Sequence, residues 1–184
     1  TTIVSALAIF GIVGFLAYKF MAVSLFPSSE KPMFMVNIET PVGTNLETTK
    51  KAVYFAETVL KKWPEIKYYS TNIGKGNPRI YYNEFQRNES ENYGQIFVQL
   101  HDDTDNLRKK EIILALRGAL SGYPNSKIKV NNFEQGSPLE APIVYKIVGE
   151  NLDSLVSLAA KIEKIISNHP GTIYIENPLK VLPT

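Results

Sequence analysis

The first 18 residues carry no charged side chain, and Lys19 is the only charged residue before Glu30. As a helix that rises about 1.5 Å per residue, the stretch 1–26 would be roughly 39 Å long, which exceeds the ~30 Å hydrocarbon core of a bilayer. Lys19 lies near the end of the stretch, where its ammonium can reach the lipid headgroups, and Pro27 ends the helix. We therefore expect residues 1–26 to form a transmembrane helix.

A signal peptide and a buried core helix both fit this stretch less well. A secretory signal peptide has a basic start, a shorter apolar segment and a small-residue cleavage site, and only the basic start could have been lost before Thr1. A buried core helix in a domain of this size rarely has 18 uncharged residues in a row. Because the chain begins with Thr1 and not with Met, we expect it to be a piece of a longer chain.

The composition excludes several classes of site. There is no cysteine, which removes disulfides, thiolate metal sites and thiol nucleophiles. The histidines His101 and His169 lack the spacing of a zinc site. Without Lys19, the 20 basic residues become 19 against 18 acidic ones, so the part after residue 26 has a charge of +1. We therefore expect no nucleic-acid partner, no metal, no other cofactor and no enzyme activity.

Three segments repeat one plan, in which an amphipathic helix is followed by a turn with a proline and then by a strand. Thr44 begins a capping box for the first helix, the second helix begins at Asp103–Asp105, and the third begins at Asn151. The predicted inner faces consist of residues three and four apart: Leu46, Thr49, Val53, Ala56, Leu60 and Trp63; then Leu107, Ile113, Leu116 and Leu120; then Leu152, Leu155, Ala159, Ile162 and Ile166.

Segments with alternating or β-branched residues predict seven strands. They are Met33–Thr40, Ile66–Ile73, Arg79–Phe85, Tyr93–Leu100, Lys127–Phe133, Ile143–Gly149 and Thr172–Glu176. The second and third could form one long strand that is interrupted at 74–78. The order over 33–133 is then β-α-β-β-α-β, the ferredoxin-like plan of an α+β protein with both helices on one face. We expect one complete unit at 33–136 and the start of a second, β-α-β copy at 140–184.

Three short motifs are better accounted for by structure than by function. The segment Gly74–Gly76 lacks the spacing of a phosphate-binding loop and is followed by a proline and a strand, which favours a turn. The strand with Tyr93 and Phe97 is similar to an RNA-recognition strand but lacks its basic opening, and we expect Phe97 to pack under a helix. The acidic residues of Asp102–Asp105 fit a helix N-terminus, which favours negative charge.

One arrangement is more specific than these motifs. After the apolar helix come Leu25-Phe26-Pro27-Ser28, a strand, and residues 40–49 with the sequence T-P-V-G-T-N-L-E-T-T. This arrangement closely resembles the resistance-nodulation-division (RND) efflux transporters of Gram-negative bacteria, the acriflavine-resistance type, with further matches at 74–79, 134–143 and 149–155. Their membrane helix ends in an F-P motif and leads into a periplasmic porter subdomain. The form of the motif resembles the second half of their duplicated chain, which would make 1–26 the seventh transmembrane helix.

The resemblance implies part of a proton-driven multidrug antiporter that expels amphiphilic small molecules. It further implies a place in the bacterial inner membrane, with most of this chain facing the periplasm. Members of the family are typically homotrimers that work with a periplasmic adaptor and an outer-membrane channel. By the same resemblance, 33–136 is a complete porter subdomain and 140–184 begins another. The proton-coupling residues of the family lie in central membrane helices, and Lys19 does not match them.

The resemblance also implies which residues contact the substrate. In the family, a loop between the second and third strands of this subdomain gates between two pockets, and it corresponds here to Ile73, Gly74, Lys75, Gly76 and Asn77. Well-known multidrug members have phenylalanines in that loop, and this chain departs from them. The strand entering the next subdomain lines the cleft, and alternation places on one side Ala141, Ile143 and Tyr145. The alternative is that this strand fills a sheet–helix core.

Two further functions remain open on the sequence. A different RND member, such as a metal exporter or a protein-export accessory pump, would use a similar porter fold. The methionines Met21, Met33 and Met35 are poorly placed for a metal relay, because they lie at the membrane exit and in the first strand. A membrane-anchored ligand-sensing module with a ferredoxin-like fold is the alternative from a separate class.

Overall fold

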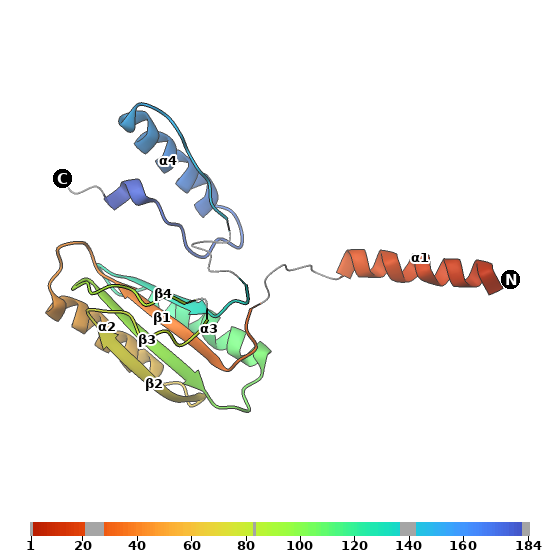
Figure 1. The fold of residues 1–184 in the computed structure, drawn as a ribbon, viewed down its shortest axis with the longest axis horizontal. Coiled ribbons are helices and arrows are strands. Elements are labelled where there is room, and N and C mark those ends of the chain that lie inside the picture. The colour runs from red at the N-terminus through yellow and green to blue at the C-terminus, as the bar shows by residue number, and fades with distance from the viewer. Residues whose placement is uncertain (1, 21–27, 83, 137–142, 182–184) are drawn as a thin grey trace.

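The computed structural model of the protein describes residues 2–20, 28–82, 84–136 and 143–181. Figure 1 shows three parts along the chain: an N-terminal helix, a sheet covered by helices, and a C-terminal helix followed by an irregular segment. Within the described ranges, every strand belongs to the middle part. The middle part therefore supplies the framework on which the candidate site is built.

Helix α1 spans Thr2–Phe20 and is apolar on every side. None of its residues is buried by protein, and it contacts no other helix or strand of the described ranges; Figure 1 shows it extending away from the sheet. Its length and composition are sufficient to cross a bilayer. This is the helix predicted over 1–26, and residues 21–27 lie outside the described part of the chain.

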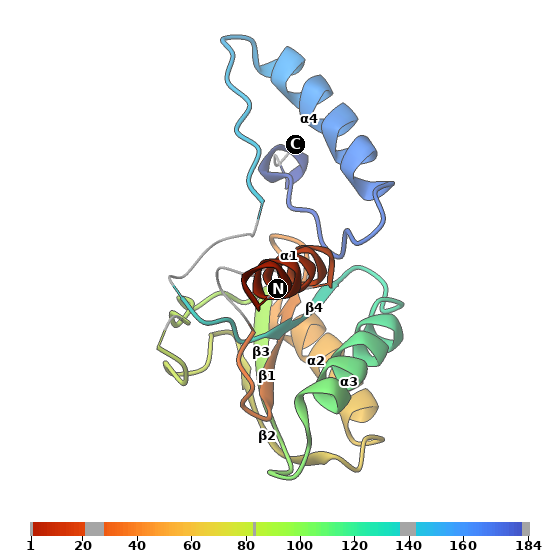
Figure 2. The ribbon, with the colours of Figure 1, turned by 90° about the vertical axis from the view of Figure 1, so that its right-hand side faces the viewer.

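The middle part is a four-stranded antiparallel sheet with the order β2-β3-β1-β4. Its strands are β1 (Met33–Glu39), β2 (Ile66–Ile73), β3 (Tyr93–Leu100) and β4 (Lys127–Asn132). Helix α2 (Leu46–Leu60) connects β1 to β2, and α3 (Asn106–Leu120) connects β3 to β4. Figure 2 shows both helices on one face of the sheet. The predicted α+β class and the β-α-β-β-α-β order are confirmed.

The core lies between this sheet and the two helices. On β1, Phe34, Val36 and Ile38 alternate with residues of the other face, and all three are completely buried. Burying a side chain of this size contributes about 1.5–3 kcal/mol. Met33 and Met35 belong to a smaller apolar cluster on the opposite face. Both faces of the central strand are therefore covered.

The helix starts agree with the capping signals to within a residue or two. The N-cap of α2 is Asn45, whose side chain accepts a hydrogen bond from the Thr48 N–H at 2.9 Å. The prediction of Thr44 as the cap is wrong by one residue, because the Asn45 side chain already satisfies the first exposed amide. The N-cap of α3 is Asp105, at the end of the predicted acidic start.

The inner face of α3 differs from the predicted one at its start. Leu107 is 72% exposed, whereas Ile112, Ile113 and Leu116 are buried together with Lys109. At 3.6 residues per turn, Leu107 lies about 200° around the helix from Lys109, on the solvent side. The prediction that Leu107 faces the core is wrong, because the apolar spacing alone did not show that a lysine occupies that face.

Three predicted strands have no counterpart in the sheet. The prediction of a strand at Arg79–Phe85 is wrong, since its described residues are irregular. Ile143–Gly149 and Thr172–Glu176 flank helix α4 (Leu152–Ser167) and likewise pair with no strand of the described ranges. A strand forms only where a neighbour completes its hydrogen bonds. Helix α4 begins after Asn151 as predicted, and a 3-10 helix, η1, follows at Pro178–Val181.

Gly94 generates a first test, because α2 crosses β3 closely at this position. A Cβ at residue 94 would lie 2.5 Å from Cγ2 of Val53, which is completely buried and cannot move away. We expect Gly94→Ala to lower the free energy of unfolding by about 1–3 kcal/mol, measured by denaturation of the chain in detergent. Gly118→Ala on α3, where the new Cβ meets no atom within 4 Å, is the control and should be neutral or stabilising. Equal losses in both variants would contradict this account of the crossing.

Candidate functional site

The predicted substrate loop, 73–77, turns away from the sheet directly at the end of β2. Gly74 has a φ of +80°, a left-handed conformation that other residues rarely adopt. Its N–H donates to the carbonyl of Tyr93 at 2.7 Å, and its carbonyl accepts from the N–H of Ser90 at 2.8 Å. The turn is therefore fixed to the start of β3 and to the end of the long connection between β2 and β3.

Asn77 anchors the far end of this turn inside the protein. Its side chain is only 3% exposed. Its backbone N–H donates to Oε1 of Gln95 at 2.6 Å, and its Oδ1 accepts from Nδ2 of Asn72 at 2.5 Å. Gly76 is also buried, and a Cβ there would lie 2.7 Å from the backbone nitrogen of Arg87. The backbone of 76–77 is thus packed tightly, whereas Lys75 is exposed.

The anchor of Asn77 continues across the sheet as a buried polar network. Nε2 of Gln95 donates to Oδ1 of Asn37 at 2.8 Å, and the hydroxyl of Tyr93 donates to the same oxygen at 3.0 Å. Burial raises the pKa of Tyr93 to about 12, against the opposing effect of the Arg87 cation. Tyr93 therefore remains a neutral hydrogen-bond donor across the physiological range.

Sequence reasoning did not find this network, although a signal for it exists. Asn37 and Gln95 are polar residues with apolar or aromatic residues on either side two positions away or nearer, and they face each other in the β1–β3 register. Directly paired residues on one face are close enough to interact. Polar residues at paired positions of two neighbouring buried strands therefore indicate a buried hydrogen bond between them.

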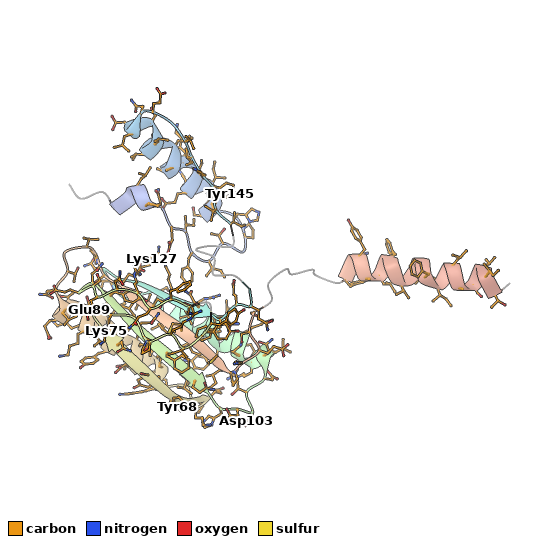
Figure 3. All side chains as sticks on the ribbon, viewed as in Figure 1. Tyr68, Lys75, Glu89, Asp103, Lys127 and Tyr145 are labelled. Carbon is orange, nitrogen blue, oxygen red and sulfur yellow. The ribbon has the colours of Figure 1, made fainter. Side chains whose placement is uncertain are left out.

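A hollow of about 420 Å³ lies beside the turn and opens to solvent. Leu46 and Ile73 give it apolar surface, and three charged side chains also line it: Lys75, Glu89 and Glu91. Figure 3 shows Lys75 and Glu89 at the same end of the sheet. An apolar concave surface with a few polar groups is the usual form of a small-molecule site.

The second set of predicted site residues lies elsewhere. Ile143 and Tyr145 are 70% and 65% exposed, and Ala141 lies outside the described residues. Figure 3 places Tyr145 near α4, well away from Lys75 and Glu89. The described residues of this set therefore do not share one pocket with the turn 73–77.

The connection between β2 and β3 folds back over the face of the sheet that the helices leave free. Tyr81 from this connection stacks on Phe133, with ring centroids 4.8 Å apart, and Phe133 lies 6.4 Å from Phe97. Figure 2 shows the connection on the side of the sheet opposite α2 and α3. The prediction that Phe97 packs under a helix is wrong, because its neighbours Ile96 and Val98 occupy the helix side.

The Asn77 anchor generates a second test. Gln95→Leu removes the oxygen that holds the Asn77 N–H, so we expect the amide of residue 77 to exchange with solvent roughly tenfold faster or more, at a stability cost of about 1–3 kcal/mol. Hydrogen exchange read by mass spectrometry measures both. Gln99→Leu is the control on the same strand, because the Gln99 side chain bonds the carbonyl of the adjacent Leu100 and not Asn77. Unchanged exchange at residue 77 in Gln95→Leu would show that Gln95 does not hold the loop.

Lys109 is a completely buried lysine that sequence reasoning did not identify. Its ammonium donates to the carbonyl of Ser29, and to that of Lys31 at 2.9 Å. The backbone of Ser29 also pairs with Phe133, at 2.7 Å. The segment that precedes β1 is therefore fixed to α3 and to the residue after β4. Burial lowers the pKa of Lys109 to about 8.

The lowered pKa of Lys109 gives a third test, because it fixes the direction in which stability changes with pH. Between pH 8 and pH 10.5 the unfolded chain binds more protons at Lys109 than the folded chain does, so this residue makes stability rise with pH in that window. We expect the stability difference between the native chain and Lys109→Met to shift by on the order of 2 kcal/mol in favour of the native chain from pH 8 to pH 10. Lys51→Met, at an exposed position of α2 that does not act on Lys109, is the control for the loss of a surface lysine. Denaturation at the two pH values measures both.

The acidic segment before α3 lies at the end of the sheet away from the hollow, as the label of Asp103 shows in Figure 3. Asp102 forms an ion pair with Lys67 at 2.8 Å. Their hydrogen bond lowers the pKa of Asp102 and raises that of Lys67. Asp105 accepts from the N–H of Arg108 at 2.6 Å. In the described ranges, no three His, Cys, Asp or Glu side chains group as metal ligands do.

A known protein family and known structures match most of the chain. The model of the AcrB/AcrD/AcrF family matches residues 1–179. Two solved structures, crystal forms I and II of a heavy metal efflux pump, match with TM-scores of 0.62 and 0.59 and 16% identity each. Each match covers 90% of this chain but only 18% or 17% of the pump, so this chain spans less than a fifth of the pump's length. At that identity the likeness shows the fold alone. No curated protein matches the sequence.

Proposed function

Because the chain belongs to the AcrB/AcrD/AcrF family of RND efflux transporters, we propose that it is part of a proton-driven multidrug efflux permease, with a porter region that forms part of the substrate cleft. The observation that carries the proposal is the turn 73–77, which is rigidly anchored at Gly74 and Asn77 and presents Ile73 and Lys75 beside a hollow. The family match spans α1, the sheet unit and α4, which argues against a membrane-anchored sensor module.

The proposal also covers the location of the protein, its partners and its substrates. The chain lies in the bacterial inner membrane, with α1 as a membrane span and the ferredoxin-like unit in the periplasm as a porter subdomain. The antiporter is a homotrimer with a periplasmic adaptor and an outer-membrane channel, and its substrates are amphiphilic small molecules. The uncovered, apolar surface of α1 supports the membrane part of this proposal.

Within the loop, we assign different tasks to different residues. Ile73 and Lys75 contact the substrate, because both line the hollow. Gly74 gives the turn its left-handed backbone, while Gly76 and Asn77 hold it from inside the protein. The loop has no phenylalanine, so the substrate meets one aliphatic side chain and one cation there. This surface lacks the aromatic rings on which an aromatic substrate could stack in the loop.

Ile143 and Tyr145 are proposed as a second wall of the cleft, together with Ala141. Both described side chains, Ile143 and Tyr145, are exposed and apolar or aromatic, which suits a contact with an amphiphile. Val144 and Val148 in the same segment are also more than 70% exposed. Exposed apolar side chains gathered in one segment indicate a surface that contacts other apolar groups.

Export of a metal is the alternative within the same superfamily. The similar solved structures are heavy metal efflux pumps, and they show a shared fold. Met33 and Met35 are 9% and 3% exposed and are packed with aromatic rings. Their thioethers therefore fill the smaller core cluster, which favours multidrug export over metal export for this chain.

The fourth test is made on the full-length transporter in cells that lack other pumps. We expect the joint change Ile143→Asp and Tyr145→Asp, and separately Ile73→Asp, to reduce export of fluorescent amphiphiles on the order of tenfold, because a charge replaces an apolar contact of the substrate. Leu107→Asp is the control for the joint change, since Leu107 is as exposed as Ile143 and Tyr145 and lies on the outer side of α3.

The outcomes separate the alternatives. A full substrate range in all of the cleft variants means that these residues do not form the cleft. A native transporter that exports divalent or monovalent metal ions but no amphiphile means that the metal exporter is the correct function. Surface expression of each variant, read by antibody labelling, excludes loss of the protein as the cause of lost export.

A further inference from the structure

The outer edge of β4 is covered by the segment that follows α4. β4 is an edge strand of the sheet, so one side of its backbone has no neighbouring strand. The N–H of Val130 donates to the hydroxyl of Tyr174 at 3.0 Å, and Nζ of Lys127 donates to the carbonyl of Ile175 at 3.3 Å. Figure 3 shows Lys127 on the side of the sheet that faces α4. Two units of the chain meet at this edge.

The same contact contains a carboxylate between two lysines. Glu176 forms an ion pair with Lys129 and lies 3.8 Å from Nζ of Lys127. The side chain of Lys129 is only 12% exposed, so its charge needs a nearby carboxylate. The other carboxylate close to it, Glu39, is already paired with Arg87. Glu176 is the carboxylate in direct contact with Lys129, while Glu39 attracts the same ammonium without a direct ion pair.

Tyr174 is held from a second direction. The guanidinium of Arg117 lies 5.8 Å from the centre of its ring, and Nε of Arg117 donates to the carbonyl of Val130 at 3.0 Å. The backbone N–H and carbonyl of Val130 therefore both have hydrogen-bond partners, one from the unit of α4 and one from α3. We name Lys127, Lys129, Tyr174 and Glu176 the β4 clasp.

We propose that Lys127 and Lys129 are positioning residues that hold the unit of α4 against the sheet unit through Glu176, and that release of this β4 clasp opens the space between the two units. The inference rests on the proposed function, in which the substrate passes between two porter subdomains. The contacts of the β4 clasp involve side chains, and no strand pairing joins 172–176 to β4 in the described ranges. The β4 clasp can therefore open without unfolding a sheet.

Opening of the β4 clasp should depend on the salt concentration and should be visible in amide exchange. Lys127 and Glu176 are 42% and 60% exposed, so salt screens their attraction. Opening exposes the Val130 N–H to solvent, since its acceptor is the Tyr174 hydroxyl. Exchange of the Val130 amide should therefore become faster as the salt concentration rises, while amides paired between β1 and β3 stay protected.

The test uses the full-length transporter in lipid vesicles. In Glu176→Gln we expect the Val130 amide to exchange roughly fivefold faster at low salt and to lose most of its salt dependence. Glu176→Asp keeps the charge and should restore much of the native behaviour. Glu150→Gln is the matched control, an exposed carboxylate in the same unit. Export of a fluorescent amphiphile by the same variants should fall in Glu176→Gln and recover in Glu176→Asp.

Each outcome has one meaning. Unchanged Val130 exchange in Glu176→Gln, or no recovery in Glu176→Asp, overturns the β4 clasp. Faster exchange with normal export shows that the β4 clasp exists but does not position the substrate path, and this overturns the positioning role. A native transporter that exports no amphiphile contradicts the proposed function, while Val130 exchange still decides whether the β4 clasp holds the two units together.

Discussion

The antiparallel pairing of β1 with β3 at the centre of the sheet is the constraint on which the rest of the structure depends. Alternation along these strands sends Phe34 and Val36 toward the helices and Asn37 and Gln95 to the opposite face. The apolar side makes the core, and the polar side holds Asn77. A shift of one residue in this register would exchange the two faces and remove both. Core and loop are thus specified by one set of backbone hydrogen bonds.

Buried or half-buried cations mark the places where the sheet unit meets its neighbours along the chain. Lys109 bonds backbone carbonyls of the segment before β1, and Lys129 bonds Glu176 of the segment after α4. The first has neutral backbone carbonyls as partners, so it acts as a fixed anchor. The second has an exposed ionic partner, so it is suited to a contact that opens. The difference lies in the partner and not in the lysine.

The helix positions could be predicted from local signals, because a cap and an apolar stripe act within one or two turns. The ferredoxin-like order followed from the same pattern. The strand prediction for Arg79–Phe85 failed because its tyrosines have high β-propensity, whereas Tyr81 packs its side chain over the free face of the sheet from an irregular backbone. Of the predicted site, the structure joins Ile73 and Lys75 in one hollow and leaves Tyr145 apart.

The sequence by itself determined that the chain begins with an apolar helix and continues into alternating amphipathic elements, because these properties depend on the periodicity of neighbouring residues. Only the tertiary structure decided that Lys109 is buried, that Gln95 holds Asn77 and that Glu176 meets Lys129. These contacts join residues 18 to 80 positions apart. Such pairs have no local pattern, since their free energy is gained only after the sheet has brought the two partners together.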